Sequence, residues 1–158
     1  MVNPGASLLV SWKRLQHLPG GTWLFSKLVN RLVPYTGSVS PRVRALEPGH
    51  AVVTLRDHRA VRNHLQSIHA VALINLGEFA SGLAMLTSLS DGQRGIVTSL
   101  SADYSKKARG VLVAESRVPP ALALTEPVDR DAEAEIRDAS GDVVAIVRAR
   151  WRISPGSA

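Results

Sequence analysis

The residue in this sequence best placed to do chemistry is Glu78. It is the only Asp, Glu, Lys or Arg in the stretch from His69 to Leu89, which otherwise consists mainly of Ala, Val, Leu, Ile, Gly and Ser. Burying a carboxylate without a partner costs several kcal/mol, roughly, or raises its pKa. Glu78 is therefore a candidate general base or nucleophile. Two structural alternatives are an ion pair with an Arg across a subunit interface and a helix-edge position that reaches solvent.

Asn63 and His69 precede Glu78, with six residues from Asn63 to His69 and nine from His69 to Glu78. We expect His69 to begin a helix, so that the backbone N–H groups of Ala70 and Val71 lie at its positive end without helical acceptors. Such donors suit a developing oxyanion. Asn63 is a candidate side-chain donor or water-positioning group, whereas His69 either takes part directly or only caps the helix.

A metal site is the competing interpretation of His58, His64, His69 and Glu78. Their spacings match no familiar ligand signature, and the loop before the helix would have to fold specially to bring them together. The sequence has no cysteine, which excludes thiolate ligands, thiol catalysis and disulfides. We therefore expect neither a metal nor a bound cofactor at this site.

The element that must position Glu78 is a long helix over residues 69–89. Apolar residues occupy nearly every side of it, which is typical of a buried helix. A charge at its midpoint argues against a transmembrane helix, so we expect no integral membrane segment. Small residues along it would let a curved sheet approach closely; they are Gly77, Ala80, Gly82 and Ala84.

Short alternating segments on both sides of this helix predict about six antiparallel strands, and therefore an α+β fold. The expected strands cover residues 39–46 and 51–55 before the helix, and 95–102, 110–116, 132–137 and 143–153 after it. The clearest hairpin turn contains Gly141 and Asp142.

Two short amphipathic helices precede the strands, separated by Pro19, Gly20 and Gly21. Their polar faces carry Lys and Arg, so attachment to a membrane surface is an alternative to packing against the domain. We expect residues 1–37 to form an N-terminal helical extension, residues 38–153 one domain, and residues 154–158 a flexible tail.

The net charge of +6, from 19 Lys and Arg against 13 Asp and Glu, favours anionic partners. Only 4% of residues are aromatic and no basic run is interleaved with stacking residues, so we do not expect nucleic acid to be the partner. The first residues lack the basic region and cleavage site of a signal peptide. Together with the lack of cysteine, this predicts a cytoplasmic protein.

The order of two strands, a long helix and four strands, combined with the spacing of Asn63, His69 and Glu78, resembles the hotdog-fold thioesterases of the phenylacetate-degradation (PaaI-like) type over residues 38–153. In that family an Asn or Gln, a histidine at the helix start and an acidic residue early in the central helix recur. The sequence is most similar to the uncharacterised branch called domain of unknown function 4442, whose members have Glu at the helix position and extra N-terminal helices.

This resemblance implies an antiparallel sheet of five to six strands wrapped around the central helix, in a homodimer or homotetramer with shared active sites. It implies hydrolysis of an acyl-coenzyme A or acyl-carrier thioester, which is the substrate rather than a cofactor. The expected site contains Glu78 as base or nucleophile, Asn63, His69, and the oxyanion donors at Ala70 and Val71. The family's usual Gly-Gly pair is Ala70-Val71 here, which favours the alternative of a non-catalytic acyl-binding or assembly protein.

A coenzyme A substrate would also need contacts for its phosphates. Lys106, Lys107 and Arg109 lie in an expected loop between strands, and with Arg62 they are candidates for this role. The alternative is a basic loop that only faces solvent.

Overall fold

The computed structural model of the protein describes residues 4–120 and 124–155. In chain order its elements are α1 (Pro4–Leu15), α2 (Gly21–Leu32), α3 (Pro34–Val39), β1 (Arg42–Glu47), β2 (His50–Arg56), η1 (Arg59–Val61), α4 (Ala70–Ser88), β3 (Arg94–Tyr104), β4 (Val111–Arg117), β5 (Val128–Arg137) and β6 (Val143–Ser154).

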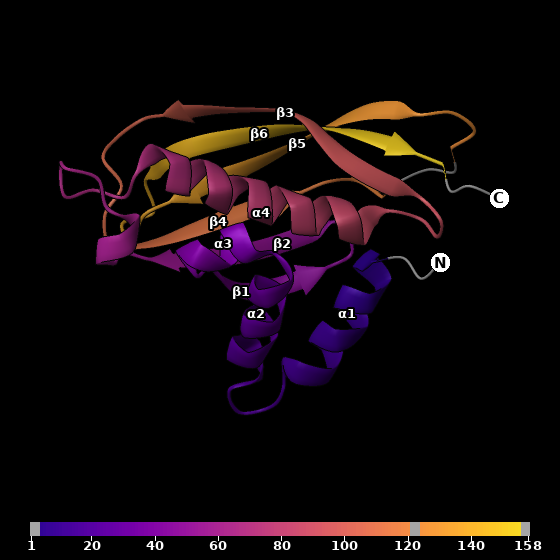
Figure 1. The fold of residues 1–158 in the computed structure, drawn as a ribbon, viewed down its shortest axis with the longest axis horizontal. Coiled ribbons are helices and arrows are strands. Elements are labelled where there is room, and N and C mark those ends of the chain that lie inside the picture. Colours follow the sequence, from indigo (N-terminus) through magenta and orange to yellow (C-terminus); the bar gives the residue numbers. More distant parts are fainter. Residues whose placement is uncertain (1–3, 121–123, 156–158) are drawn as a thin grey trace.

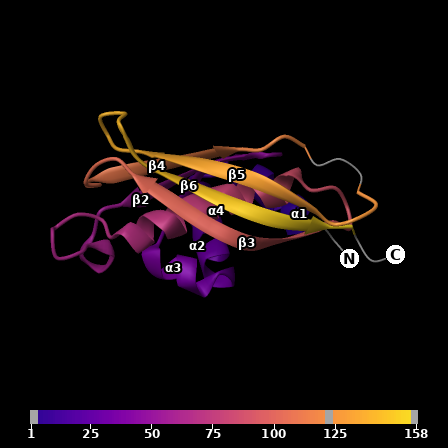
Figure 2. The same ribbon diagram turned by 90° about the horizontal axis from the view of Figure 1, so that it is seen from above.

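The six strands form one antiparallel sheet in the order β1-β2-β4-β5-β6-β3. The sheet curves around α4, while α1 and α2 project from the opposite side of that helix (Figure 1). Seen from above, β3 and β6 cross over α4, and α2 and α3 lie beneath it (Figure 2). The predicted hotdog arrangement, with a six-stranded sheet, a central helix and N-terminal helices, is confirmed.

The central helix α4 is buried along most of its length, as its composition predicts. Among the described residues, α4 is the one helix that is long and apolar enough to cross a membrane, but most of it is buried inside the protein. It is therefore a core helix. Close approach of the sheet depends on Gly77, because a Cβ at this position would overlap the side chain of Val147 on β6.

The N-terminal helices cover one edge of the sheet. The rings of Trp12 on α1 and Phe25 on α2 meet edge to face, with centroids 5.1 Å apart. Ser26 Oγ on α2 accepts the backbone N–H of Val43 at 3.0 Å, which satisfies a donor on the edge strand β1. The other edge strand, β3, lies at the opposite side of the sheet.

A third N-terminal helix, α3, replaces the start of the predicted first strand. The expectation of a strand from Val39 was wrong, because α3 runs from Pro34 to Val39 and β1 begins at Arg42. Pro34 stands at the start of α3, where a missing N–H costs no helical hydrogen bond. The helix therefore extends across the predicted boundary between residues 37 and 38.

Opposite charges face one another across the outer surface of β5 and β6. The register places Asp129 opposite Arg152, Asp131 opposite Arg150 and Glu133 opposite Arg148. The side chains of each pair form ion pairs of 2.7–3.0 Å. Although exposed ion pairs add little stability, a one-residue slip would break all three and turn the apolar face outward. The hairpin turn before β6 contains Gly141, as predicted.

At the C-terminus, β6 continues through Ser154, the first residue of the predicted flexible tail. Pro155 follows the strand, and residues 156–158 lie outside the described residues.

Two glycines of α4 allow a matched test of helix–sheet contact. We expect Gly77→Ala to lower the free energy of unfolding by about 1–3 kcal/mol, because the new methyl group would overlap Val147. Gly82→Ala should be neutral or stabilising, because its Cβ would make ordinary contacts, 3.4 Å from Trp151, and alanine favours a helix. Urea unfolding measures both, and equal stability of Gly77→Ala and wild type would contradict this packing.

Candidate functional site

Glu78 lies on α4 at the wall of an apolar pocket of about 400 Å³. Its side chain is half-buried, and a Cβ placed on Gly82, one turn along the helix, would lie 3.9 Å from Oε1 of Glu78. Among residues 4–120 and 124–155, no side chain forms a hydrogen bond or ion pair with this carboxylate. Burial raises the pKa of Glu78 above its ordinary value.

The pocket beside Glu78 lies between the N-terminal helices and the core. Apart from Glu78 and two serines its lining is apolar or glycine, contributed by α1, α2, α4, β6 and the residue after α2: Pro4, Ser7, Leu8, Ser11, Val29, Leu32, Val33, Phe79, Gly82, Leu83, Leu86 and Trp151. The N-terminal helices therefore pack on the domain and also form half of this pocket. The sequence predicted their packing but not their part in the pocket.

Asn63 lies in the loop before α4, where its side-chain oxygen organises the backbone. Oδ1 accepts the N–H of Leu65 at 2.9 Å, the N–H of Ser67 at 3.3 Å and the hydroxyl of Ser67 at 3.1 Å. The carbonyl oxygen is thus committed to the loop. The amide nitrogen has no partner among the described residues, so it is the part of Asn63 that can face a substrate.

His69 caps the helix, one of the two roles considered for it. Its Nδ1 accepts the N–H of Val71 at 3.1 Å, so one of the two expected oxyanion donors already has an acceptor. The N–H of Ala70 has no acceptor among the described residues. Tyr104, which sequence reasoning did not select, donates its hydroxyl to the carbonyl oxygen of Ala70 at 3.2 Å and ties the end of β3 to the helix start.

The helix itself separates Glu78 from the other candidates within one protomer. Glu78 stands eight positions after Ala70, which corresponds to a rise of about 12 Å along the helix axis. Asn63, His69, Ala70 and Val71 cluster at the helix start, whereas Glu78 faces the apolar pocket. One protomer therefore does not bring the carboxylate and the oxyanion donors to one point.

Most of the predicted phosphate-binding cations have partners inside the protein. Arg62 pairs with Asp57 at 2.6 Å, and Lys106 pairs with Asp138 and Asp142 at 2.7 and 2.6 Å. Arg109 donates to the backbone carbonyls of residues 65 and 66. Of the four, Lys107 alone has no such partner among the described residues.

The histidines considered as metal ligands do not gather. Among the described residues, no group of three or more His, Asp or Glu side chains comes together in a way that could hold a metal ion. His58 instead lies in a separate basic hollow with Lys27, Arg42 and Arg56, none of which was selected from the sequence.

The raised pKa of Glu78 predicts a pH-dependent gain in stability for Glu78→Gln. A carboxyl group with a higher pKa in the folded state favours folding at low pH, and this contribution is lost as the pH rises through the folded-state pKa. We expect the variant to unfold at a higher temperature than wild type near pH 8, by on the order of a few degrees. The difference should disappear below about pH 4, where both states are protonated.

Glu126→Gln is the matched control, because Glu126 is exposed and has no ion pair among the described residues. Thermal unfolding followed by circular dichroism at both pH values compares the three proteins. A Glu78→Gln protein no more stable than wild type near pH 8 would show that Glu78 is not desolvated.

Solved structures similar to this chain share its fold. A structural-genomics protein is 25% identical, with 94% of this chain and 98% of that one covered and a TM-score of 0.79. A Pseudomonas aeruginosa protein of unknown function, described as a probable thioesterase, is 24% identical, with 87% and 97% covered and a TM-score of 0.76. The PaaI protein of the E. coli phenylacetic acid degradation operon is 19% identical, with 84% and 96% covered and a TM-score of 0.65.

No curated protein matches the sequence. A family model described as a domain of unknown function, DUF4442, matches residues 21–153, which include α2, α3, the central helix and the sheet apart from the last residue of β6. The chain therefore belongs to the DUF4442 family, whose fold here is the hotdog fold of the PaaI-like thioesterases.

Proposed function

We propose that the protein hydrolyses acyl thioesters, with Glu78 activating water or attacking the acyl carbon. The observation that carries this proposal is an unpaired, half-buried carboxylate at the wall of an apolar pocket. The pocket would hold the acyl group and place its carbonyl carbon beside Glu78. The Pseudomonas aeruginosa neighbour, which is described as a probable thioesterase, supports this reaction class.

The chemistry of a thioester fits a site with a single carboxylate. A thiolate leaves readily because its conjugate thiol has a pKa of about 8.5, so the site needs a base but no strong acid. Burial raises the pKa of Glu78 above its ordinary value, which makes its carboxylate a better proton acceptor. Water adds its oxygen to the acyl carbon, the C–S bond breaks, and the products are a carboxylic acid and a thiol.

The oxyanion donor would come from a second copy of the chain, because one protomer keeps its own helix start about 12 Å from Glu78. The edge strand β3 offers a surface for this copy. Its exposed apolar side chains are Ile96, Leu100 and Tyr104, and exposed edges of this kind pair readily with another strand. In such a homodimer, or a homotetramer built from it, the N–H of Ala70 and the amide nitrogen of Asn63 would face the partner's pocket.

The thiol half of the substrate would be coenzyme A or an acyl-carrier arm, and we place this reaction in the cytoplasm. The basic loop residue Lys107 has no partner among the described residues and is a candidate phosphate contact. Arg62, Lys106 and Arg109 would reach a substrate only by exchanging the partners that they have in this structure.

A second candidate function, binding of an acyl group without hydrolysis, is favoured by the start of α4. His69 accepts the N–H of Val71, and this valine side chain projects with 48% of its surface exposed, at a position where the resemblance to PaaI-like thioesterases implies glycine. Both features reduce access to the helix start. The two functions share the same pocket and differ in turnover.

The catalytic proposal predicts that Glu78→Gln loses activity while keeping its fold. Thiol release from short, medium, long and aromatic acyl-coenzyme A esters should fall by about a hundredfold or more, the usual scale for loss of a general base. Glu126→Gln should retain wild-type rates. Absence of wild-type turnover on every ester would leave acyl binding as the function, whereas equal turnover in Glu78→Gln would show that Glu78 does not carry the reaction.

The pocket predicts which part of the chain selects the acyl group. Leu32→Trp adds bulk at an exposed position that lines the pocket, so hydrolysis of long acyl esters should fall roughly tenfold relative to short ones. Leu24→Trp on the same helix is also exposed but does not line the pocket, and it should leave the preference unchanged. Steady-state kinetics on both variants measure this ratio, and an unchanged ratio in Leu32→Trp would place the acyl group elsewhere.

A further inference from the structure

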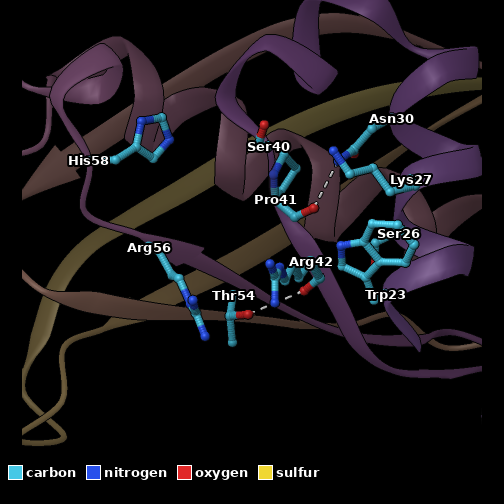
Figure 3. Close-up of a pocket in the computed structure, with 10 residues that line it drawn as sticks. All are labelled: Trp23, Ser26, Lys27, Asn30, Ser40, Pro41, Arg42, Thr54, Arg56 and His58. Carbon is cyan, nitrogen blue, oxygen red and sulfur yellow. Dashed lines mark hydrogen bonds between the residues drawn. The ribbon is translucent and has the colours of Figure 1, made fainter. Parts of the chain in front are cut away.

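A second hollow, of about 160 Å³, lies between α2 and the strands β1 and β2. Figure 3 shows α2 side chains on one side of it, Arg42, Thr54 and Arg56 on another, and His58 at the far end. We call it the basic pocket, and its lining residues are Trp23, Ser26, Lys27, Asn30, Ser40, Pro41, Arg42, Thr54, Arg56 and His58. The α2 residues that line the pocket beside Glu78 are different ones, so the two pockets use different faces of α2.

The basic pocket contains three permanent cations and no acidic residue. Lys27, Arg42 and Arg56 form no ion pair with any described residue. Asp57, the acid next to Arg56 in sequence, is engaged by Arg62 and by the N–H of Gly110. The positive charge of this pocket is therefore free to bind an anion.

The excess positive charge of the protein is concentrated in the N-terminal part of the chain, which includes the residues of the basic pocket. Residues 1–62 contain nine Lys and Arg and two Asp and Glu, a net charge of +7. Residues 63–158 contain ten Lys and Arg and eleven Asp and Glu, a net charge of −1. The net charges of the two parts add up to the overall charge of +6. The basic pocket thus lies in the part of the chain that carries all of the excess positive charge.

Two further features restrict the ligand. Asn30 donates through Nδ2 to the carbonyl of Pro41 at 3.0 Å, which fixes its amide and leaves a buried Oδ1 without a donor. A ligand N–H or O–H group would satisfy this oxygen. Trp23 keeps 48% of its surface exposed at the same pocket, with Nζ of Lys27 5.9 Å from its ring centroid, and offers a flat surface for a ring.

We propose that the basic pocket binds the phosphate group of a nucleotide. Lys27, Arg42 and Arg56 would contact the phosphate through charge-assisted hydrogen bonds, the strongest kind for this anion. Asn30 Oδ1 would accept a hydrogen bond from the sugar or base, and the base would stack on Trp23. The nucleotide is either the nucleotide half of a coenzyme A substrate, a case that rests on the proposed function, or a separate free nucleotide.

Isothermal titration calorimetry on the full chain tests this proposal with coenzyme A, 3′-dephospho-coenzyme A, ADP, adenosine and inorganic phosphate. The test variant is Lys27→Gln/Arg56→Gln, which removes two exposed cations of the pocket. The control is Lys13→Gln/Arg94→Gln, which removes the same charge at exposed positions outside it. Glu78→Gln is titrated as well, so that nucleotide binding is also measured in a protein that lacks the proposed catalytic carboxylate.

We expect saturable binding of at least one phosphorylated adenosine compound and not of adenosine, weakened at least tenfold in the test variant and weakened further by added salt. The control and Glu78→Gln should bind as wild type does. Binding of ADP as tight as that of coenzyme A identifies a separate free nucleotide, and binding of coenzyme A alone identifies the substrate. No binding, or equal loss in the test and control variants, would overturn the proposal whatever the thioesterase assay shows.

Discussion

Nearly every side of α4 must be removed from water, and the other elements are arranged to achieve this. An apolar helix of 19 residues cannot be covered by one sheet face. The curved sheet covers one side, with Gly77 allowing the approach of Val147. The hairpin of α1 and α2 packs against another side, held together by the ring contact between Trp12 and Phe25. The pocket beside Glu78 remains where these two coverings meet.

Glu78 derives its properties from this same arrangement. A carboxylate on a solvated helix would be an ordinary surface charge, but here burial without a partner raises its pKa and places it against apolar side chains. The core therefore tolerates a group that lowers stability at neutral pH. Such a trade between stability and chemistry is common where a side chain has a function.

The other charged side chains of the molecule include two groups, one paired across the sheet and one without ion pairs in the described part of the chain. On the outer face of the sheet, acidic residues of β5 and basic residues of β6 stand opposite one another and neutralise each other. Around α2, β1 and β2, the cations Lys27, Arg42 and Arg56 have no ion pair among the described residues. The net positive charge of the protein therefore comes from its N-terminal part.

The sequence by itself determined the class of fold, the long buried helix and Glu78 as its single charge. These follow from local patterns: alternation for the strands, an unbroken apolar stretch for α4, and the spacing of Asn63, His69 and Glu78. Only the tertiary structure decided that Asn63 Oδ1 and the N–H of Val71 are engaged within the loop and cap, and that Arg62 and Lys106 have acidic partners. It also decided that α1 and α2 form a pocket wall, and that Arg42 and Arg56 meet Lys27. Local patterns specify which face of an element is apolar, whereas partners of single polar groups depend on contacts between residues far apart in the chain.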